Sequence, residues 1–137
     1  MRPHIFLTAE KAGQLRSVEE ARAATRSGIG QELWQGILDR TDADLSRDPI
    51  TPRSEFPERE AIHARHGNAD WTACFAAGQR ILRAALINLL TGDERYRDLA
   101  LRQITSLFDP KDWPMWCDNA HVHQGSPPVD LRTGMLC

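Results

Sequence analysis

The segment from Asp112 to Gln124 holds the side chains best suited to contact a ligand. Tryptophan rings stack on the apolar face of a sugar ring, and Asn, Gln and His side chains form hydrogen bonds with hydroxyls or a carboxylate. An arginine follows at the start of a further predicted helix. The predicted substrate-binding residues are therefore Trp116, Asn119, His121, His123, Gln124 and Arg132.

A structural interpretation of the same segment stays open. Trp113 and Trp116 can instead close the end of a helical hairpin, and the histidines can be exposed or bonded to nearby carbonyls. Arg132 can form a surface ion pair with a neighbouring aspartate. The structural interpretation suits Trp113 better, whereas ligand binding suits the polar residues Asn119, His121 and Gln124.

A metal site is a further interpretation of this segment. In an extended chain His121 and His123 would lie on one face, and Cys117 or Asp118 could complete a zinc shell. No second pair of ligands stands at a suitable spacing. We therefore predict no metal site and no cofactor for these residues.

The remaining polar candidates have structural explanations. His63 and His66 lie in a charged segment after several prolines, so we expect them to be solvated, with contact to an anionic substrate as the alternative. Tyr96 is the only tyrosine, at a position expected in a helix core with its hydroxyl at the helix edge. Arg80 and Arg83 are expected to lie away from the apolar stripe of their helix.

Two predicted helices precede the polar segment and must position it. The first runs from about Asp70 to Leu90, with an apolar stripe made of Trp71, Phe75, Leu82, Leu86 and Leu89. Gly92 suits the left-handed position that ends a helix, and Asp93 can cap the next helix, which Pro110 ends. The buried face of that second helix is predicted to consist of Tyr96, Leu99, Ala100, Ile104 and Leu107. The pattern predicts an antiparallel helical hairpin.

The first third of the chain predicts shorter helices. Thr8 can cap one, and Ser17 can cap a second over residues 18–27, after which Gly28 and Gly30 break the chain. A longer helix is predicted over residues 31–45, with the apolar residues Leu33, Trp34, Ile37, Leu38 and Leu45. Its charged residues are expected largely on another face, namely Asp39, Arg40, Asp42 and Asp44.

A proline-rich stretch separates this helix from the hairpin. Pro49, Pro52 and Pro57 rule out a continuous helix or a central strand over residues 48–68, which we predict to be a surface crossing. Asp130 can cap a last helix that has only begun by Cys137. We therefore expect residues 1–137 to be a single partial domain at the front of a longer protein.

Four motifs in a fixed order give the chain a family resemblance. They are Arg2-Pro3-His4-Ile5-Phe6-Leu7-Thr8-Ala9-Glu10, then Trp34 in a helix before the proline-rich crossing, then Leu89-Leu90-Thr91-Gly92-Asp93-Glu94-Arg95-Tyr96, then Asp130-Leu131-Arg132-Thr133-Gly134. In this order the chain resembles the N-terminal part of heparinase II/III-like polysaccharide lyases, over almost its whole length. The third motif alone also occurs in several other toroidal carbohydrate enzymes.

The resemblance implies an all-α fold, an incomplete α/α toroid built of antiparallel helical hairpins, with β-sandwich-like domains behind it. It implies cleavage of acidic polysaccharides such as alginate or glycosaminoglycan-like chains by β-elimination. That reaction neutralises the uronate carboxylate, removes the C5 proton and protonates the leaving oxygen. The family's catalytic Tyr and His are expected in later helices, so we assign no catalytic residue here. A divalent ion in further domains stays open.

Two other functions are compatible with the same residues. A non-catalytic helical-repeat module would use such hairpins to bind a glycan or a protein. A toroidal glycoside hydrolase would need two acidic residues facing one cleft. Asp112, Asp118 and Asp130 are available for that role, but no spacing singles out a pair.

Composition excludes some partners. The 137 residues carry 17 basic and 19 acidic side chains, a net charge of -2, which creates no field that would gather nucleic acid or an anionic membrane. No apolar run approaches the roughly 20 residues of a membrane span. Cys74, Cys117 and Cys137 share no CxxC spacing, so we expect free thiols, which are typical of a reducing compartment. The implied relatives look exported, so the compartment stays open.

Overall fold

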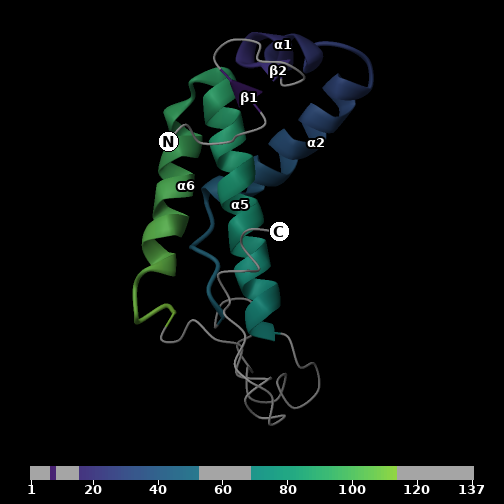
Figure 1. Cartoon of the computed structure of the whole chain (residues 1–137). Coiled ribbons are helices and arrows are strands. Elements are labelled where there is room, and N and C mark those ends of the chain that lie inside the picture. Colours follow the sequence, from purple (N-terminus) through teal and green to yellow (C-terminus); the bar gives the residue numbers. More distant parts are fainter. Residues whose placement is uncertain (1–6, 9–15, 53–68, 114–137) are drawn as a thin grey trace.

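The computed structural model describes residues 7–8, 16–52 and 69–113 (Figure 1). Its elements are β1 (Leu7–Thr8), β2 (Arg16–Ser17), α1 (Val18–Ala24), α2 (Gly28–Leu45), α5 (Ala69–Thr91) and α6 (Glu94–Leu107). Within these ranges the only strands are β1 and β2, a two-residue parallel pair that places Leu7 opposite Arg16. The predicted all-α fold class is confirmed. Thr8, expected to cap a helix, lies in β1, and residues 9–15 lie outside the described part.

Helices α5 and α6 form the predicted antiparallel hairpin and lie side by side (Figure 1). Gly92 ends α5 with a φ of 77°, a conformation that strains residues with a Cβ atom. Its amide donates to the carbonyl of Asn88 at 2.7 Å. The Asp93 carboxylate caps α6 by accepting from the amide of Arg95 at 3.0 Å. Both predicted roles at this turn are confirmed.

Two apolar clusters hold the helices together. One surrounds the hairpin turn and contains Ala84, Ile87, Tyr96, Leu99 and Ala100, with Trp34, Ile37, Leu38, Leu45 and Ile81 packed against it. The other lies towards the opposite end of the hairpin and contains Ile50, Ala73, Cys74, Ala77, Leu107 and Trp113. Burial of these groups is the main favourable term for the fold. Cys74 is a buried thiol, as expected.

Two leucines of the predicted apolar stripe of α5, Leu82 and Leu89, face away from this core, whereas Phe75 and Leu86 are half-buried. Leu82 and Leu89 are 56% and 42% exposed, whereas Ala77, Ala84 and Ile87 are fully buried. Residues 82 and 84 are roughly 200° apart on a helix, so the two sets lie on opposite faces. Side-chain size favours the leucine face in the sequence, but alanines face α6 because they let two helix backbones approach closely.

Helix α2 differs from its prediction in its start and in its buried face. It begins at Gly28, whose φ is 57°, and Gly30 lies within its first turn, so the chain breaks at residues 25–27 instead. Leu33, expected in the core, is 63% exposed, and Asp44, expected outside, is 5% exposed. The physical reason is an ion-pair partner on α5, described below.

Helix α1 has the predicted cap and a shorter length than predicted. The Ser17 hydroxyl accepts from the amide of Glu20 at 3.1 Å, and the Glu20 carboxylate accepts from the amide of Ser17 at 2.9 Å. This reciprocal pair is a capping box. Arg22 donates from Nε to the carbonyl of Leu90 at 2.7 Å, which ties α1 to the C-terminal end of α5.

One helix has the length and composition of a membrane span, contrary to the expectation from the sequence. It covers residues Thr72–Thr91 of α5. The core helix of a folded domain can have the same length and composition, and this one contributes Ala77 and Ile87 to the apolar clusters. It also carries the buried Arg80 within an ion-pair network, as a helix packed inside a protein does.

Candidate functional site

The residues predicted to bind a sugar lie outside the described part of the chain. These are Trp116, Asn119, His121, His123, Gln124 and Arg132, and the expected surface histidines His63 and His66 are likewise outside it. Trp113 is the last described residue, 2% exposed among the core residues, and its amide donates to the carbonyl of Asp109 at 2.8 Å. The structural interpretation of Trp113 is confirmed: it closes the end of the hairpin.

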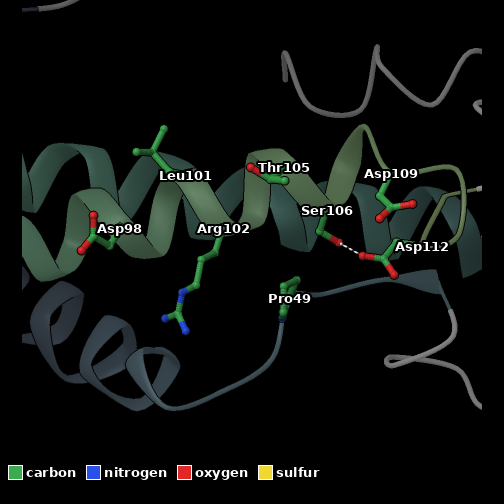
Figure 2. A pocket seen from close by; sticks show the side chains of 8 residues that line it. All are labelled: Pro49, Asp98, Leu101, Arg102, Thr105, Ser106, Asp109 and Asp112. Carbon is green, nitrogen blue, oxygen red and sulfur yellow. Dashed lines mark hydrogen bonds between the residues drawn. The ribbon is translucent and has the colours of Figure 1, made fainter.

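An open groove of about 610 Å³ runs along α6 and ends at the turn before Trp113. The segment that follows α2 forms its other wall, where Pro49 lies (Figure 2). The lining residues are Pro49, Asp98, Leu101, Arg102, Thr105, Ser106, Asp109 and Asp112. Because this groove leads to residue 113, the predicted binding segment starts at its end.

Hydrogen bonds fix several of the polar side chains in the groove. The Ser106 hydroxyl donates to Oδ2 of Asp112 at 2.5 Å, and the two side chains point towards each other (Figure 2). Oδ1 of Asp109 accepts from the amide of Lys111 at 2.8 Å. Arg102 donates from Nη2 to the carbonyl of Leu45 at 2.9 Å. Ser106 is 5% exposed, so its role is to orient Asp112 and not to react.

The charge of the groove limits its ligands. Three carboxylates and one guanidinium line it, so its net charge is negative. Leu101 and Pro49 supply apolar surface between these polar groups. Such a surface suits a ligand that is rich in hydroxyls, because carboxylates and hydroxyls accept and donate hydrogen bonds around an apolar sugar face. Asp109 and Asp112 form an acidic end of the groove, which disfavours an anionic group of a ligand at that end.

Of these lining residues, only Asp112 is a candidate from the sequence alone. The signal that could have found the others is the spacing of Asp98, Arg102, Thr105 and Asp109, which places one polar stripe on α6. Asp112 is available in the sequence as one acid of a glycoside hydrolase pair. It is bonded to Ser106, and its two possible partners, Asp118 and Asp130, lie outside the described residues.

A buried polar network beneath the groove positions the segment that carries Pro49. Within it, Asp44 Oδ1 accepts from Arg80 Nη2 and Asp44 Oδ2 accepts from Arg83 Nη2, both at 3.0 Å. Arg80 is 3% exposed and also donates to the carbonyl of Asp48 at 2.7 Å. We call Asp44, Arg80, Arg83 and Gln103 the arginine network. Both arginines lie away from Leu82 and Leu89 of the predicted apolar stripe, as expected. The expectation for Asp44 was wrong: it is buried, because Arg80 and Arg83 supply its ion-pair partners.

Gln103 completes this connection. Its Nε2 donates to the carbonyl of Ile50 at 2.9 Å, and its Oε1 accepts from the amide of Ile50 at 2.8 Å. These two bonds imitate the pairing of a strand, so they satisfy the backbone of a segment that has no helix of its own. The wall of the groove is therefore held by α5 and α6.

Tyr96 has the predicted structural role. It is 4% exposed, and its hydroxyl donates a hydrogen bond to Oδ1 of Asp42. Burial and this bond to Asp42 together raise the pKa of Tyr96 to about 12. A buried phenol whose O–H group donates a hydrogen bond to a carboxylate stays protonated near neutral pH, so it does not serve as a catalytic base there. Asp42 is exposed, as expected, and accepts this bond at the edge of α2.

Comparisons with known proteins do not assign a family. No protein-family model, curated protein or solved structure matches the chain. Among residues 7–8, 16–52 and 69–113, no group of three His, Cys, Asp or Glu side chains is arranged to hold a metal ion. A functional assignment therefore depends on the motifs, the hairpin and the groove.

Proposed function

We propose that these residues form the N-terminal helical part of a polysaccharide lyase that cleaves uronic-acid-containing glycans by β-elimination. The observation that carries the proposal is the ordered set of motifs, in which the hairpin turn at Gly92 and Asp93 belongs to the third. The antiparallel pair of α5 and α6 is the unit from which α/α toroids are built. The toroid itself is part of the proposal.

The reaction needs a base for the C5 proton, a group that neutralises the carboxylate and an acid for the leaving oxygen. Tyr96 is excluded as the base by its bond to Asp42 and by a pKa of about 12. We therefore propose that the catalytic Tyr and His belong to helices beyond this chain. Residues 116–132 would contribute substrate contacts.

A direct assay tests the proposal. The full-length gene product that contains these residues is incubated with alginate, heparin, chondroitin and ulvan, and the ultraviolet absorbance of the unsaturated product is followed. Elimination creates a carbon–carbon double bond conjugated with the carboxylate, so absorbance rises with each cut. Absence of a rise with every acidic glycan, by a folded enzyme, would contradict the proposal.

A second experiment tests the predicted binding residues. His121→Ala and Gln124→Ala in the full-length enzyme should each lower kcat/KM by about tenfold, because each removes a hydrogen bond to the substrate. His63→Ala and His66→Ala are the controls, since they replace polar side chains in the proline-rich crossing. Equal losses in both pairs would remove the reason for assigning the site to residues 116–124.

A non-catalytic glycan-binding module is the second candidate. The groove favours it, because its polar groups surround Leu101 and Pro49 and Ser106 is held as a donor to Asp112. This candidate predicts binding of oligosaccharides without any unsaturated product. The same incubations, with bound and cleaved glycan measured separately, distinguish it from the lyase and from a hydrolase, which would release saturated ends.

A further inference from the structure

We infer that Arg47 and Arg102, at the end of the groove nearest α2, bind the carboxylate or sulfate group of an acidic polysaccharide. Arg47, Arg80 and Arg102 line one recess together with Pro49, Leu99 and Gln103. The recess is too narrow for a water molecule, so a ligand would contact the guanidiniums at its mouth. Pro49 and Arg102 line both the recess and the groove, which makes the two continuous.

The arginine network leaves these two guanidiniums available. Asp44 has two carboxylate oxygens, and Arg80 and Arg83 each donate to one of them at 3.0 Å. Arg47 forms an ion pair with the same carboxylate at 3.7 Å, beyond hydrogen-bond distance, and its side chain is 66% exposed. Arg102 donates to the neutral carbonyl of Leu45. Both guanidiniums therefore keep donors that the Asp44 carboxylate does not occupy.

Local charge favours an anion at this end. The six residues that line the recess include three arginines and no acid. Asp98 lines the adjoining groove, and Asp48 is next to Arg47 in the chain. The C-terminal end of α2 adds a partial negative charge. Four guanidiniums lie near this end, those of Arg47, Arg80, Arg83 and Arg102. The nearby carboxylates are three, Asp44, Asp48 and Asp98, so positive charges are in excess.

The side chains at the two ends of the groove differ in charge, so they favour one orientation of a bound acidic sugar. A guanidinium binds a carboxylate or sulfate through two parallel hydrogen bonds. Asp109 and Asp112 at the opposite end repel a second anion and accept from hydroxyls. Thr105 lies between the two ends on α6 (Figure 2). The arrangement fits an acidic sugar with its charged group at Arg47 and Arg102 and its hydroxyls towards Asp112.

The choice of ligand class rests on the proposed function, but the test measures binding alone. The 137-residue chain is titrated by calorimetry with alginate and heparin oligosaccharides, and with cellulose oligosaccharides as the neutral probe. Arg47→Ala and Arg102→Ala should each weaken binding of the acidic probes by about tenfold, the loss expected for a charge-assisted hydrogen bond. Raised salt should weaken binding further.

Two other arginines serve as matched controls. The side chains of Arg95 and Arg97 are 69% and 59% exposed, close to the value for Arg47, but each is paired with an acid of its own helix end. Arg95→Ala and Arg97→Ala should change affinity by less than about twofold. Arg102→Lys separates a loss of binding from a loss of folding, because it keeps the positive charge but removes the planar pair of donors. It should bind more weakly than the parent chain at an unchanged melting temperature.

Three results would overturn the inference. They are no binding of either acidic probe by the parent chain, equal losses in the Arg95 and Arg97 variants, and equal affinity for the neutral probe. Failure of the lyase proposal has a different signature: the chain binds acidic oligosaccharides through Arg47 and Arg102, yet the full-length enzyme releases no unsaturated product.

Discussion

The turn of the hairpin joins α5 to α6, and the arginine network joins α2 to α5. The two are held by different means. At the turn, the contacts are local in sequence: Gly92 donates to Asn88, and Asp93 caps the helix that follows it. In the network, Asp44 contacts Arg80 and Arg83, which are separated from it by 36 and 39 residues. The first is formed by neighbours along the chain, and the second requires α2 to be packed already.

This difference determines how each region responds to substitution. A turn with local contacts loses a small, bounded amount of free energy when one residue changes. A buried ion-pair network loses more, because the remaining partner keeps its charge without water. The comparison therefore predicts large effects at Asp44, intermediate effects in the apolar cluster and small effects at the turn.

The largest expected effect is that of Asp44→Ala. It leaves Arg80 buried without its carboxylate, so we expect the free energy of unfolding to fall by about 4 kcal/mol. Urea denaturation followed by circular dichroism measures this change. Asp39→Ala is the control on the same helix, because Asp39 is exposed and accepts from the nearby Gln35. A loss below about 1 kcal/mol at Asp44 would show that the network is not a major support of the fold.

A double substitution sharpens the same point. Asp44→Leu with Arg80→Met removes both charges and fills a similar volume. Because buried ion pairs can be replaced by apolar residues at little cost, the double variant should be more stable than Asp44→Leu alone. If the double variant lost as much free energy of unfolding as the two single variants together, this result would contradict the direct coupling that the 3.0 Å contact indicates.

In the apolar cluster, Leu99→Ala should destabilise the fold by about 3 kcal/mol, through lost burial and the cavity that remains. Leu99 is 2% exposed, whereas Leu101 on the same helix is 47% exposed. Leu101→Ala should therefore change stability by less than about 1 kcal/mol. Thermal unfolding of both variants provides the comparison. Similar losses at the two positions would mean that the outer face of α6 is covered in solution.

Tyr96 lies near the hairpin turn, bonds to Asp42 of α2, and makes stability depend on alkaline pH. Its pKa of about 12 in the folded state lies above the ordinary value of 10.0, so the folded state holds the phenol proton more tightly. The stabilisation is complete below about pH 10 and is lost as pH rises towards 12. The expected loss is about 2 kcal/mol. Tyr96→Phe should lack this step in unfolding curves recorded across the interval, and persistence of the step would assign it to another group.

The smallest effects are expected at two glycines, with opposite signs. Gly92→Ala places a Cβ atom at a φ of 77° and should destabilise the hairpin by about 1 kcal/mol. Gly36 lies inside α2, with open space where a Cβ atom would extend, so Gly36→Ala should stabilise by about 0.5–1 kcal/mol. Melting temperatures that shift in the same direction for both variants would contradict the assigned backbone conformations.

The candidate site was only partly predictable from the sequence. The structural role of Trp113 followed from its place at the end of a hairpin, and that of Tyr96 from its helical position. The groove was missed because its walls come from α6 and from the segment around Pro49. A single sequence contains no signal that brings those two segments together. The predicted contacts from Trp116 to Arg132 remain predictions.

Four features could be predicted from the residues alone: the all-α class, the hairpin, the cap at Ser17 and the turn at Gly92 and Asp93. Each depends on interactions within a few residues, where backbone geometry and capping chemistry leave few alternatives. Which face of α5 is buried depends instead on how α5 packs against α2 and α6. Small alanines and Arg80 face inward there, because close helix approach and a partner at Asp44 outweigh the burial of larger leucines on the other side.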